Sequence, residues 1–473
     1  MKTKLKAEKA VYKPFKVTLF KGNPLIEALR PALDIHSFAK KIAYRVSYDE
    51  GGELDDFERE LSIELIDLTY TVPPDLYPLY KTILKNILTG YIHRNPVKRD
   101  MKAEQHKASV EGDYHFPVTK NLSKCISIIG VSGAGKTLSV RQCCSFIPQV
   151  IRHSRYKGES LILDQIVYIE FQAPVTKTRR GFVLSFFIAV DLVIGTKYYN
   201  EWKGKSISIP ILIQEAKKVA LNHSLGMAFI DEIQRCASIG AKDDYPTLEF
   251  IDDFFNSVGV PLIVAGTPKA RPLFDTTMST TRRLSSSRKF SITNIENDLS
   301  NLELGGQSYW SIFLKSFHYP QLLKKSFEFN LEFMTHVYDL TAGLPALTAR
   351  LMRLAYEQAV ESEEEILSIE LLDEIYYEQF DLLHKAIESL ISGDDYGYED
   401  ILPNHAFKTS NERLLEEAIN NDIRYHDRLA KKNNGDEGEV LEFEEVAEDY
   451  IPIDDIRNLK GLSKDELIEK LVN

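Results

Sequence analysis

The chain has 473 residues, a formal net charge of −12, and 44% hydrophobic and 27% charged residues. This length exceeds what one compact core needs, so we expect two or three domains. No uninterrupted apolar stretch approaches the roughly 20 residues that span a bilayer, and the basic N-terminus lacks the apolar core of a secretory signal. The composition excludes a membrane protein and indicates a globular cytoplasmic one.

The negative charge is concentrated near the C-terminus. Residues 394–473 carry 22 Asp and Glu against 10 Lys and Arg, whereas residues 1–393 carry 48 of each. Within this neutral body Lys and Arg cluster in four segments, 92–102, 152–157, 177–180 and 282–283. Such clusters contact phosphates or form solvated loops, so the net charge does not exclude a nucleic-acid partner.

The cysteines do not form a recognisable metal or redox motif. They stand at positions 125, 143, 144 and 236, with no CxxC pair and no histidine at metal-ligand spacing. We expect them to pack as small buried hydrophobes.

The first segment with clear helical spacing is PLYKTILKNILTGYIHR at 78–94. Leu79, Ile83, Ile87 and Leu88 recur about every four residues, and Pro96 then interrupts the pattern. We assign residues 1–110 to an N-terminal helical extension.

From about 121 to 295 short apolar strands alternate with amphipathic helices, a pattern typical of a parallel α/β sheet. The predicted strands are 125–129, 165–171, 226–231, 261–266 and 288–292. The predicted helices between them are 137–147, 181–195, 211–223 and 248–259. Residues 111–300 therefore form the predicted α/β core.

Helical periodicity replaces this alternation from about 307 to 392. One helix is predicted within 344–361 and a second over 367–391. We assign 301–393 to a helical lid and 394–473 to an acidic C-terminal tail. The tail is either a docking arm for basic partner surfaces or a solvated segment, with a flexible link at 431–439.

GVSGAGKT at 130–137 lies between a predicted strand and a predicted helix, the context of a phosphate-binding loop. Glycines let the backbone curl around phosphate oxygens, Lys136 faces the outer phosphates, and the Thr137 hydroxyl is a ligand for Mg²⁺. The predicted nucleotide-binding residues are Gly130, Ser132, Gly133, Ala134, Gly135, Lys136, Thr137, Leu138 and Asp231. The sequence thus predicts ATP and Mg²⁺ as ligands.

The second half of this site is GMAFIDEIQ at 226–234, an apolar strand that ends in two carboxylates. Asp231 is expected to hold Mg²⁺ together with Thr137, and Glu232 to polarise the attacking water as general base. The pair predicts an ATPase, with Lys136 and Glu232 in catalytic roles.

Two further elements complete the predicted catalytic set. Thr267 follows the strand 261–266, where a polar side chain senses the γ-phosphate or holds water, or is an ordinary strand-end threonine. Arg282 and Arg283 precede the last strand, a position from which arginines reach a neighbouring subunit's nucleotide. Arg288 competes for that role, and phosphate contacts or salt bridges remain alternatives for all three.

The order of these elements resembles the AAA+ ATPase class: phosphate loop, carboxylate pair, sensor, arginine finger and helical lid. TAGLPALTARLM at 341–352 resembles the start of that class's second-sensor helix. Arg350 lies later in the helix than the usual sensor arginine, so that role is not carried over.

A narrower resemblance is to the TnsC family of transposition regulators. It rests on GYIHRNP at 90–96, FIAVDLVIGTKYY at 187–199, FIDEIQ at 229–234, VAGTP at 264–268 and the TRR before the last strand. The phrases are short and follow the family's order from about residue 20 to 390.

This resemblance implies an ATP-dependent adaptor that oligomerises on double-stranded DNA as a ring or filament. It implies that the adaptor links target-selection proteins to a transposase and that hydrolysis resets it. QAPVTKTRRGF at 172–182 fits the DNA-facing position, where Thr176, Lys177, Thr178 and Arg179 would contact phosphates without reading bases. A solvated loop is the alternative for this segment.

Other classes of P-loop protein remain alternatives. A replication-initiator or clamp-loader-like AAA+ ATPase is one, although the acidic C-terminus shows no basic winged-helix region. A STAND-type signalling ATPase would carry effector or repeat domains, which are not seen. A scaffold that only binds ATP would have no need of Glu232 as a base.

Overall fold

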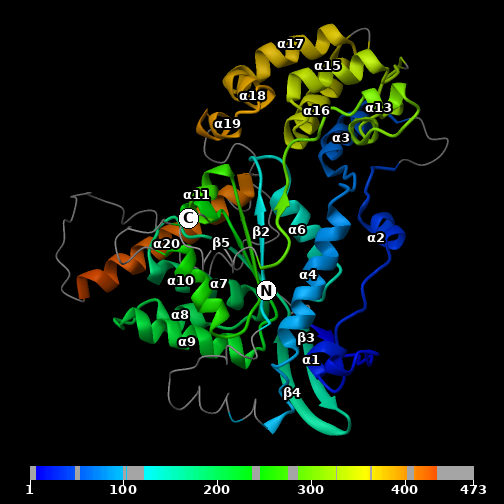
Figure 1. Ribbon diagram of the computed structural model, residues 1–473. Helices are drawn as coiled ribbons and strands as arrows, with labels where there is room; N and C mark the ends of the chain where they lie inside the picture. Colours follow the sequence, from blue (N-terminus) through cyan, green and yellow to red (C-terminus); the bar gives the residue numbers. More distant parts are fainter. Residues whose placement is uncertain are drawn as a thin grey trace.

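The centre of the molecule is a five-stranded parallel sheet with the order β5-β6-β7-β2-β8 (Figure 1). Its strands are β2 Cys125–Ile129, β5 Ile169–Gln172, β6 Ala228–Asp231, β7 Leu262–Gly266 and β8 Phe290–Ser291. The computed structural model describes residues 7–47, 54–99, 103, 122–236, 246–274, 286–325, 327–362, 365–401 and 410–433. The predicted parallel α/β core is confirmed.

One strand prediction was partly wrong. The predicted strand 165–171 spans the end of one strand and the start of another, because β4 Glu159–Ile166 ends before β5 begins. β4 pairs antiparallel with β3 Val150–Tyr156, and β1 Glu8–Lys9 adds to β3 in a second small sheet. Lys157 and Gly158 turn the hairpin with φ of 50° and 88°, a turn that glycine favours.

Side chains of the central strands alternate between the two faces of the sheet, so each face has its own helical layer. Ile126 and Ile128 pack against α4 Leu76–Tyr91 and α6 Lys136–Cys144. On the other face lie α7 Arg179–Ile194, α9 Ile209–Asn222 and α10 Leu248–Asn256. The helix α4, predicted in the N-terminal extension, therefore covers the core sheet.

The lid is a helical unit with its own hydrophobic core beyond the carboxyl ends of the strands (Figure 1). Its helices are α14 Tyr309–Lys315, α15 Leu331–Thr341, α16 Pro345–Glu361, α17 Ile369–Gln379, α18 His384–Ile391 and α19 Asp395–Ile401. The single helix predicted over 367–391 is instead broken at Phe380. There the His384 ring stacks on Tyr376 and hydrogen-bonds its carbonyl oxygen at 2.9 Å, which closes the turn between α17 and α18.

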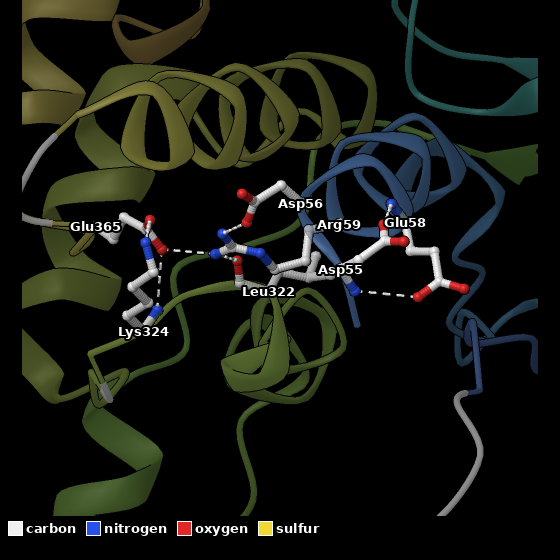
Figure 2. A network of polar contacts seen from close by, with 7 residues as sticks. All are labelled: Asp55, Asp56, Glu58, Arg59, Leu322, Lys324 and Glu365. Carbon is white, nitrogen blue, oxygen red and sulfur yellow. Dashed lines mark hydrogen bonds and ion pairs between the residues drawn. The ribbon is translucent and has the colours of Figure 1, made fainter. Parts of the chain in front are cut away.

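An N-terminal helix joins the lid through a buried charge network (Figure 2). Arg59 on α3 Asp56–Glu64 donates to Glu365 at 2.6 Å, and the two side chains are 8% and 6% exposed. Asp56 and Lys324 complete the network. The described part of the N-terminal region therefore packs on both units, α3 on the lid and α4 on the core.

The described part of the acidic C-terminal segment packs against other elements. α19 lies against α18 and the turn after β7, and Tyr398 belongs to the lid core. α20 Ser410–Asn433 packs on α7, with Ala418 and Ile423 in the core beside that helix. A solvated tail is thus wrong for 395–401 and for the contact face of α20, and the link predicted at 431–439 falls mostly outside the described residues.

The remaining helices of the described ranges are short, and none of the described helices is long and apolar enough to cross a membrane. They are α1 Pro24–Glu27, α2 Ile35–Ile42, α8 Tyr198–Trp202, α11 Arg271–Phe274 and α13 Ser300–Glu303.

All four cysteines are buried with free thiols in the hydrophobic cores, and burial raises the pKa of Cys236 to about 12.

Candidate nucleotide-binding site

The loop 130–135 connects β2 to α6 in a conformation that requires glycine at three positions. A Cβ on Gly130 would lie 1.6 Å from the carbonyl oxygen of Ile292, and Gly133 and Gly135 have φ of 83° and 89°. Side chains are disfavoured in this left-handed region, so these glycines permit the tight curl. The curl precedes the N-terminus of a nine-residue helix, a place where backbone N–H groups bind anions.

Lys136 begins this helix and is held inside the loop. Its side chain is 9% exposed, and Nζ donates to the carbonyl oxygen of Val131 at 2.9 Å. Burial lowers the pKa of the ammonium group, while the carboxylates of Asp231, Glu399 and Glu232 act in the opposite direction. The cation that the sequence assigned to the phosphates is therefore stabilised by the negative charge of three carboxylates.

The two predicted metal ligands are in contact. The Thr137 hydroxyl donates to Oδ2 of Asp231, which is buried at the end of β6. The other oxygen of Asp231, Oδ1, accepts from the backbone N–H of Glu232 at 2.8 Å. Glu232 has a left-handed backbone with φ of 56°, a costly conformation that positions the next carboxylate beside Asp231.

Gln234 connects this carboxylate to the neighbouring strand. Its Nε2 donates to Oε2 of Glu232 at 3.0 Å, and its Oε1 accepts from the backbone N–H of Thr267 at 3.2 Å. Thr267 directly follows β7, and its Oγ1 is buried without a hydrogen-bond partner among the described residues. An unpaired buried hydroxyl is costly, which fits a site whose ligand supplies the missing partner.

Arg235 links the same carboxylate to the C-terminal helix. Its guanidinium lies 3.5 Å from Oε2 of Glu232 and 2.6 Å from Oε1 of Glu416 on α20. It also donates to Gln172 Oε1 and the Ala173 carbonyl, both at 3.2 Å. α20 is therefore coupled to the predicted general base through one arginine.

One of the three candidate arginine fingers, Arg288, lies in the described part of the chain. Arg282 and Arg283 lie outside the described residues. Arg288 precedes β8, the edge strand beside β2, and its guanidinium lies 3.6 Å from Asp75 and over the ring of Phe290. Arg288 thus does not join this chain's own loop.

The lid meets the loop at the start of α16, where the Ala346 N–H donates to the Gly133 carbonyl at 3.3 Å. Arg350, further along this helix, donates to the Gln379 carbonyl at 2.9 Å and stacks on Phe380. Its side chain therefore packs within the lid.

The predicted DNA-contacting residues divide into two pairs. Lys177 is exposed, and Arg179 is partly exposed beside the ring of Phe250. Thr178 is buried and caps α7 by accepting from the Gly181 N–H at 3.0 Å, and the Thr176 hydroxyl is buried as well. The threonines shape the turn, while Lys177 is exposed and Arg179 lies against Phe250.

Several other basic residues are engaged within the chain. Arg180 is buried and donates to three carbonyls, among them that of Lys203 at 3.1 Å. Arg94 is buried and donates to the Leu225 carbonyl at 2.6 Å, and Arg152 pairs with Asp164 at 2.7 Å. Arg94 and Arg180 therefore stabilise the fold from inside.

Residues 120–274, about a third of the chain, match the family model described as "AAA domain". This segment is an AAA domain. The AAA domain contains the loop, both carboxylates and Thr267, and the parallel sheet gives it the AAA+ P-loop fold. No curated protein matches the chain in sequence.

Three of the solved structures that are similar to this chain share 12–14% of its sequence. DnaA from Aquifex aeolicus bound to AMPPCP is 14% identical over 71% of this chain and 87% of its own, with a TM-score of 0.29. Cdc6p from Pyrobaculum aerophilum is 12% identical over 79% and 86%, with a TM-score of 0.28. NtrX from Brucella abortus with ATP is 12% identical over 70% and 68%, with a TM-score of 0.27. These scores carry no weight for function.

The residues of the AAA domain fit a nucleotide with Mg²⁺. The loop needs glycine where a Cβ would collide, and Thr267 Oγ1 has no hydrogen-bond partner in the described part of the chain. Thr137 and Asp231 supply the hard oxygen ligands that Mg²⁺ prefers. Sequence reasoning missed Gln234, Arg235 and Glu399. Gln234 and Arg235 directly follow the carboxylate pair and so had a local signal, whereas nothing links Glu399 to a loop more than 260 residues earlier.

Proposed function

We propose that this chain is an ATP-hydrolysing AAA+ regulator of DNA transposition that assembles on duplex DNA. In this proposal it connects target-selection proteins to a transposase, and hydrolysis resets the assembly. One observation carries the ATPase part: the Thr137 hydroxyl contacts Asp231, with Glu232 held next to it. The transposition part rests on the resemblance to the TnsC family.

Each residue of the site has a separate role in the proposed reaction. The loop N–H groups and Lys136 bind the phosphates of ATP, and Thr137 with Asp231 hold Mg²⁺, which neutralises phosphate charge when bound. Glu232 orients and deprotonates the attacking water, and Thr267 Oγ1 senses the γ-phosphate. Gln234 keeps the Glu232 carboxylate oriented while its own amide oxygen holds the strand that carries Thr267.

The proposed DNA contact is electrostatic. Lys177 and Arg179 present positive charge at the N-terminus of α7, in the segment that the TnsC resemblance assigns to DNA. Contacts to phosphates carry no base information, so binding would be independent of sequence and sensitive to salt. Neighbouring subunits would supply Arg282 or Arg283 to each nucleotide.

The test is assembly on plain duplex DNA, followed by electron microscopy and sedimentation with ATP, with ADP and without nucleotide. We expect rings or filaments with ATP and their loss as ATP is consumed. The Glu232→Gln variant should bind ATP and stay assembled, because it keeps the site's shape but lacks the base. Dispersed monomers under all conditions would contradict assembly, and a strict preference for one duplex sequence would favour a replication initiator.

The link to transposition is tested separately, by capture of proteins encoded beside this gene on immobilised Glu232→Gln assemblies. Recovery of a transposase with ATP and its loss with ADP would support the proposal. ATP-independent recovery, or no transposase in either state, would contradict it.

A further inference from the structure

The lid helix α19 places a carboxylate directly on the phosphate loop. Glu399 Oε1 accepts from the backbone N–H of Ser132 at 2.5 Å, and its Oε2 accepts from the Ser132 hydroxyl at 3.0 Å. Ser132 is the third residue of GVSGAGKT, within the stretch whose N–H groups serve phosphates. Because both oxygens accept hydrogen bonds, the contact suits an ionised carboxylate.

The same carboxylate lies in the field of the loop lysine. Burial raises the pKa of Glu399, while the hydrogen bond from the Ser132 N–H and the positive charge of Lys136 act in the opposite direction. Lys136 is the cation that the outer phosphates of a nucleotide need. Glu399 therefore satisfies a donor and a charge that a bound triphosphate would use.

Neighbouring residues fix Glu399 in this place. The Tyr398 hydroxyl donates to the Ser132 carbonyl at 2.9 Å, and the Tyr398 side chain is fully buried in the lid core. Lys269, two residues after Thr267, donates to the Glu399 carbonyl at 3.0 Å and pairs with Asp400 at 2.6 Å. Arg271 lies 3.6 Å from Asp395. α19 thus bridges the phosphate loop and the turn that follows β7.

We propose that Glu399 determines nucleotide specificity by competing with the γ-phosphate for the Ser132 side of the loop. This inference rests on the proposed function, because it deepens the role of the ATP site. ADP, which lacks the γ-phosphate, leaves Glu399 in place. ATP brings negative charge toward Lys136, so the like charge of Glu399 opposes it until α19 moves off the loop. α19 then reports the γ-phosphate to the lid and to Lys269.

A purely structural clip is the competing explanation for these contacts. A clip would affect ADP and ATP equally, because it would act through the shape of the loop and not through charge. The nearly isosteric Glu399→Gln substitution separates the two, since it removes the charge and keeps the side-chain size.

The experiment measures the Kd of ADP and of a non-hydrolysable ATP analogue, with Mg²⁺, for the full chain and for Glu399→Gln. We expect roughly tenfold tighter binding of the analogue by the variant and little change for ADP. Asp381→Asn is the matched control, because Asp381 is an exposed lid carboxylate outside α19, and it should leave both constants unchanged. Tyr398→Phe should weaken the docking of α19 on the loop. It should therefore lower the Kd of the ATP analogue, as Glu399→Gln does, but by a smaller factor.

Equal changes for both nucleotides, or none, would overturn the inference. Hydrogen exchange of the unchanged chain gives a second measurement that needs no variant: amides of 395–401 should exchange faster with the ATP analogue than with ADP. Equal exchange in the two states would also overturn it. Failure of the unchanged chain to bind either nucleotide would instead contradict the proposed function, so the two failures are distinguishable.

Discussion

Gln234 donates a hydrogen bond from its side-chain amide to Oε2 of Glu232 at 3.0 Å. The oxygen of the same amide accepts from the backbone N–H of Thr267 at 3.2 Å. A single planar group therefore fixes both the predicted general base and the start of the turn after β7. Gln234 acts through these neighbours, as a positioning residue of the proposed ATPase.

Replacing Gln234 with alanine should lower kcat for ATP hydrolysis by roughly tenfold, because a carboxylate that is free to rotate is less often aimed at the water. KM for ATP should change little, since Gln234 does not lie on the phosphate loop. Steady-state hydrolysis over a range of ATP concentrations separates the two constants. Gln358→Ala on the lid helix α16 is the control, and a rise in KM with kcat unchanged would contradict the positioning role.

A second prediction concerns the charge of Lys177, which is exposed at a position with φ of 51°. Lys177→Glu should weaken binding to duplex DNA. It should also reduce the slope of log K against the logarithm of the salt concentration by about one, the value of one phosphate contact. Nucleotide affinity should stay the same. Fluorescence anisotropy with labelled duplex at several salt concentrations measures both effects.

The chain offers a closely matched control in Lys157, another exposed lysine in a turn, with φ of 50°. It lies in the β3–β4 hairpin and not in the proposed DNA-facing segment. If Lys157→Glu weakened DNA binding as much as Lys177→Glu, the prediction of a specific contact at the start of α7 would be contradicted.

The sequence pattern predicted β2 and the phosphate loop correctly, because the structure of each depends on residues that are neighbours in the chain. CISII became β2 with the predicted bounds because four of its five residues are apolar and all five are buried, as in a strand covered on both faces. The glycines and Lys-Thr predicted the loop, since backbone geometry and phosphate chemistry demand those residue types. The β3–β4 hairpin was missed because VIRHSRY and ESLILDQI mix charged and apolar residues, which hides the alternation.

Contacts between distant segments could not be predicted in the same way. Arg94 lies in a basic segment of the kind that contacts phosphates. It is nevertheless buried, and it donates a hydrogen bond to the carbonyl oxygen of Leu225, 131 residues away. Glu399 belongs to a run of acids that suggested a solvated tail. The folding of the lid brings Glu399 to Ser132. The two residues are 267 positions apart, so no pattern of sequence spacing could predict this contact.

A third prediction tests the glycine at the first position of the loop. Gly130→Ala would place a Cβ 1.6 Å from the Ile292 carbonyl, so the backbone between β2 and β8 must shift. We expect a loss of about 3 kcal/mol in the free energy of unfolding and a loss of nucleotide binding. Gly204→Ala is the control, because its added Cβ meets nothing within 4 Å. Unchanged denaturant midpoints for Gly130→Ala would contradict the close approach.

The last prediction concerns the buried pair of Arg59 and Glu365 that ties α3 to the lid (Figure 2). Hydrogen bonds from Arg59 and Lys324 lower the pKa of Glu365 to about 2, below the usual range of a glutamate. A depressed pKa stabilises the fold above the unfolded-state pKa of about 4.3, and this contribution falls as the pH drops toward 2. Near neutral pH, Glu365→Gln should therefore cost about 2 kcal/mol, because among the described residues Arg59 would keep Asp56 alone as an ionic partner.

Denaturant unfolding of the Glu365→Gln variant and the unchanged chain from pH 7 to pH 2.5 measures this contribution. The difference in unfolding free energy should be constant above about pH 5.5 and shrink steadily below pH 4, since protonated Glu365 resembles glutamine in charge. Glu361→Gln, at an exposed position near the end of α16, should show no such pH-dependent difference. A gap that stayed constant down to pH 2.5 would mean that Glu365 stabilises the lid by packing alone, and that its charge does not hold α3 in place.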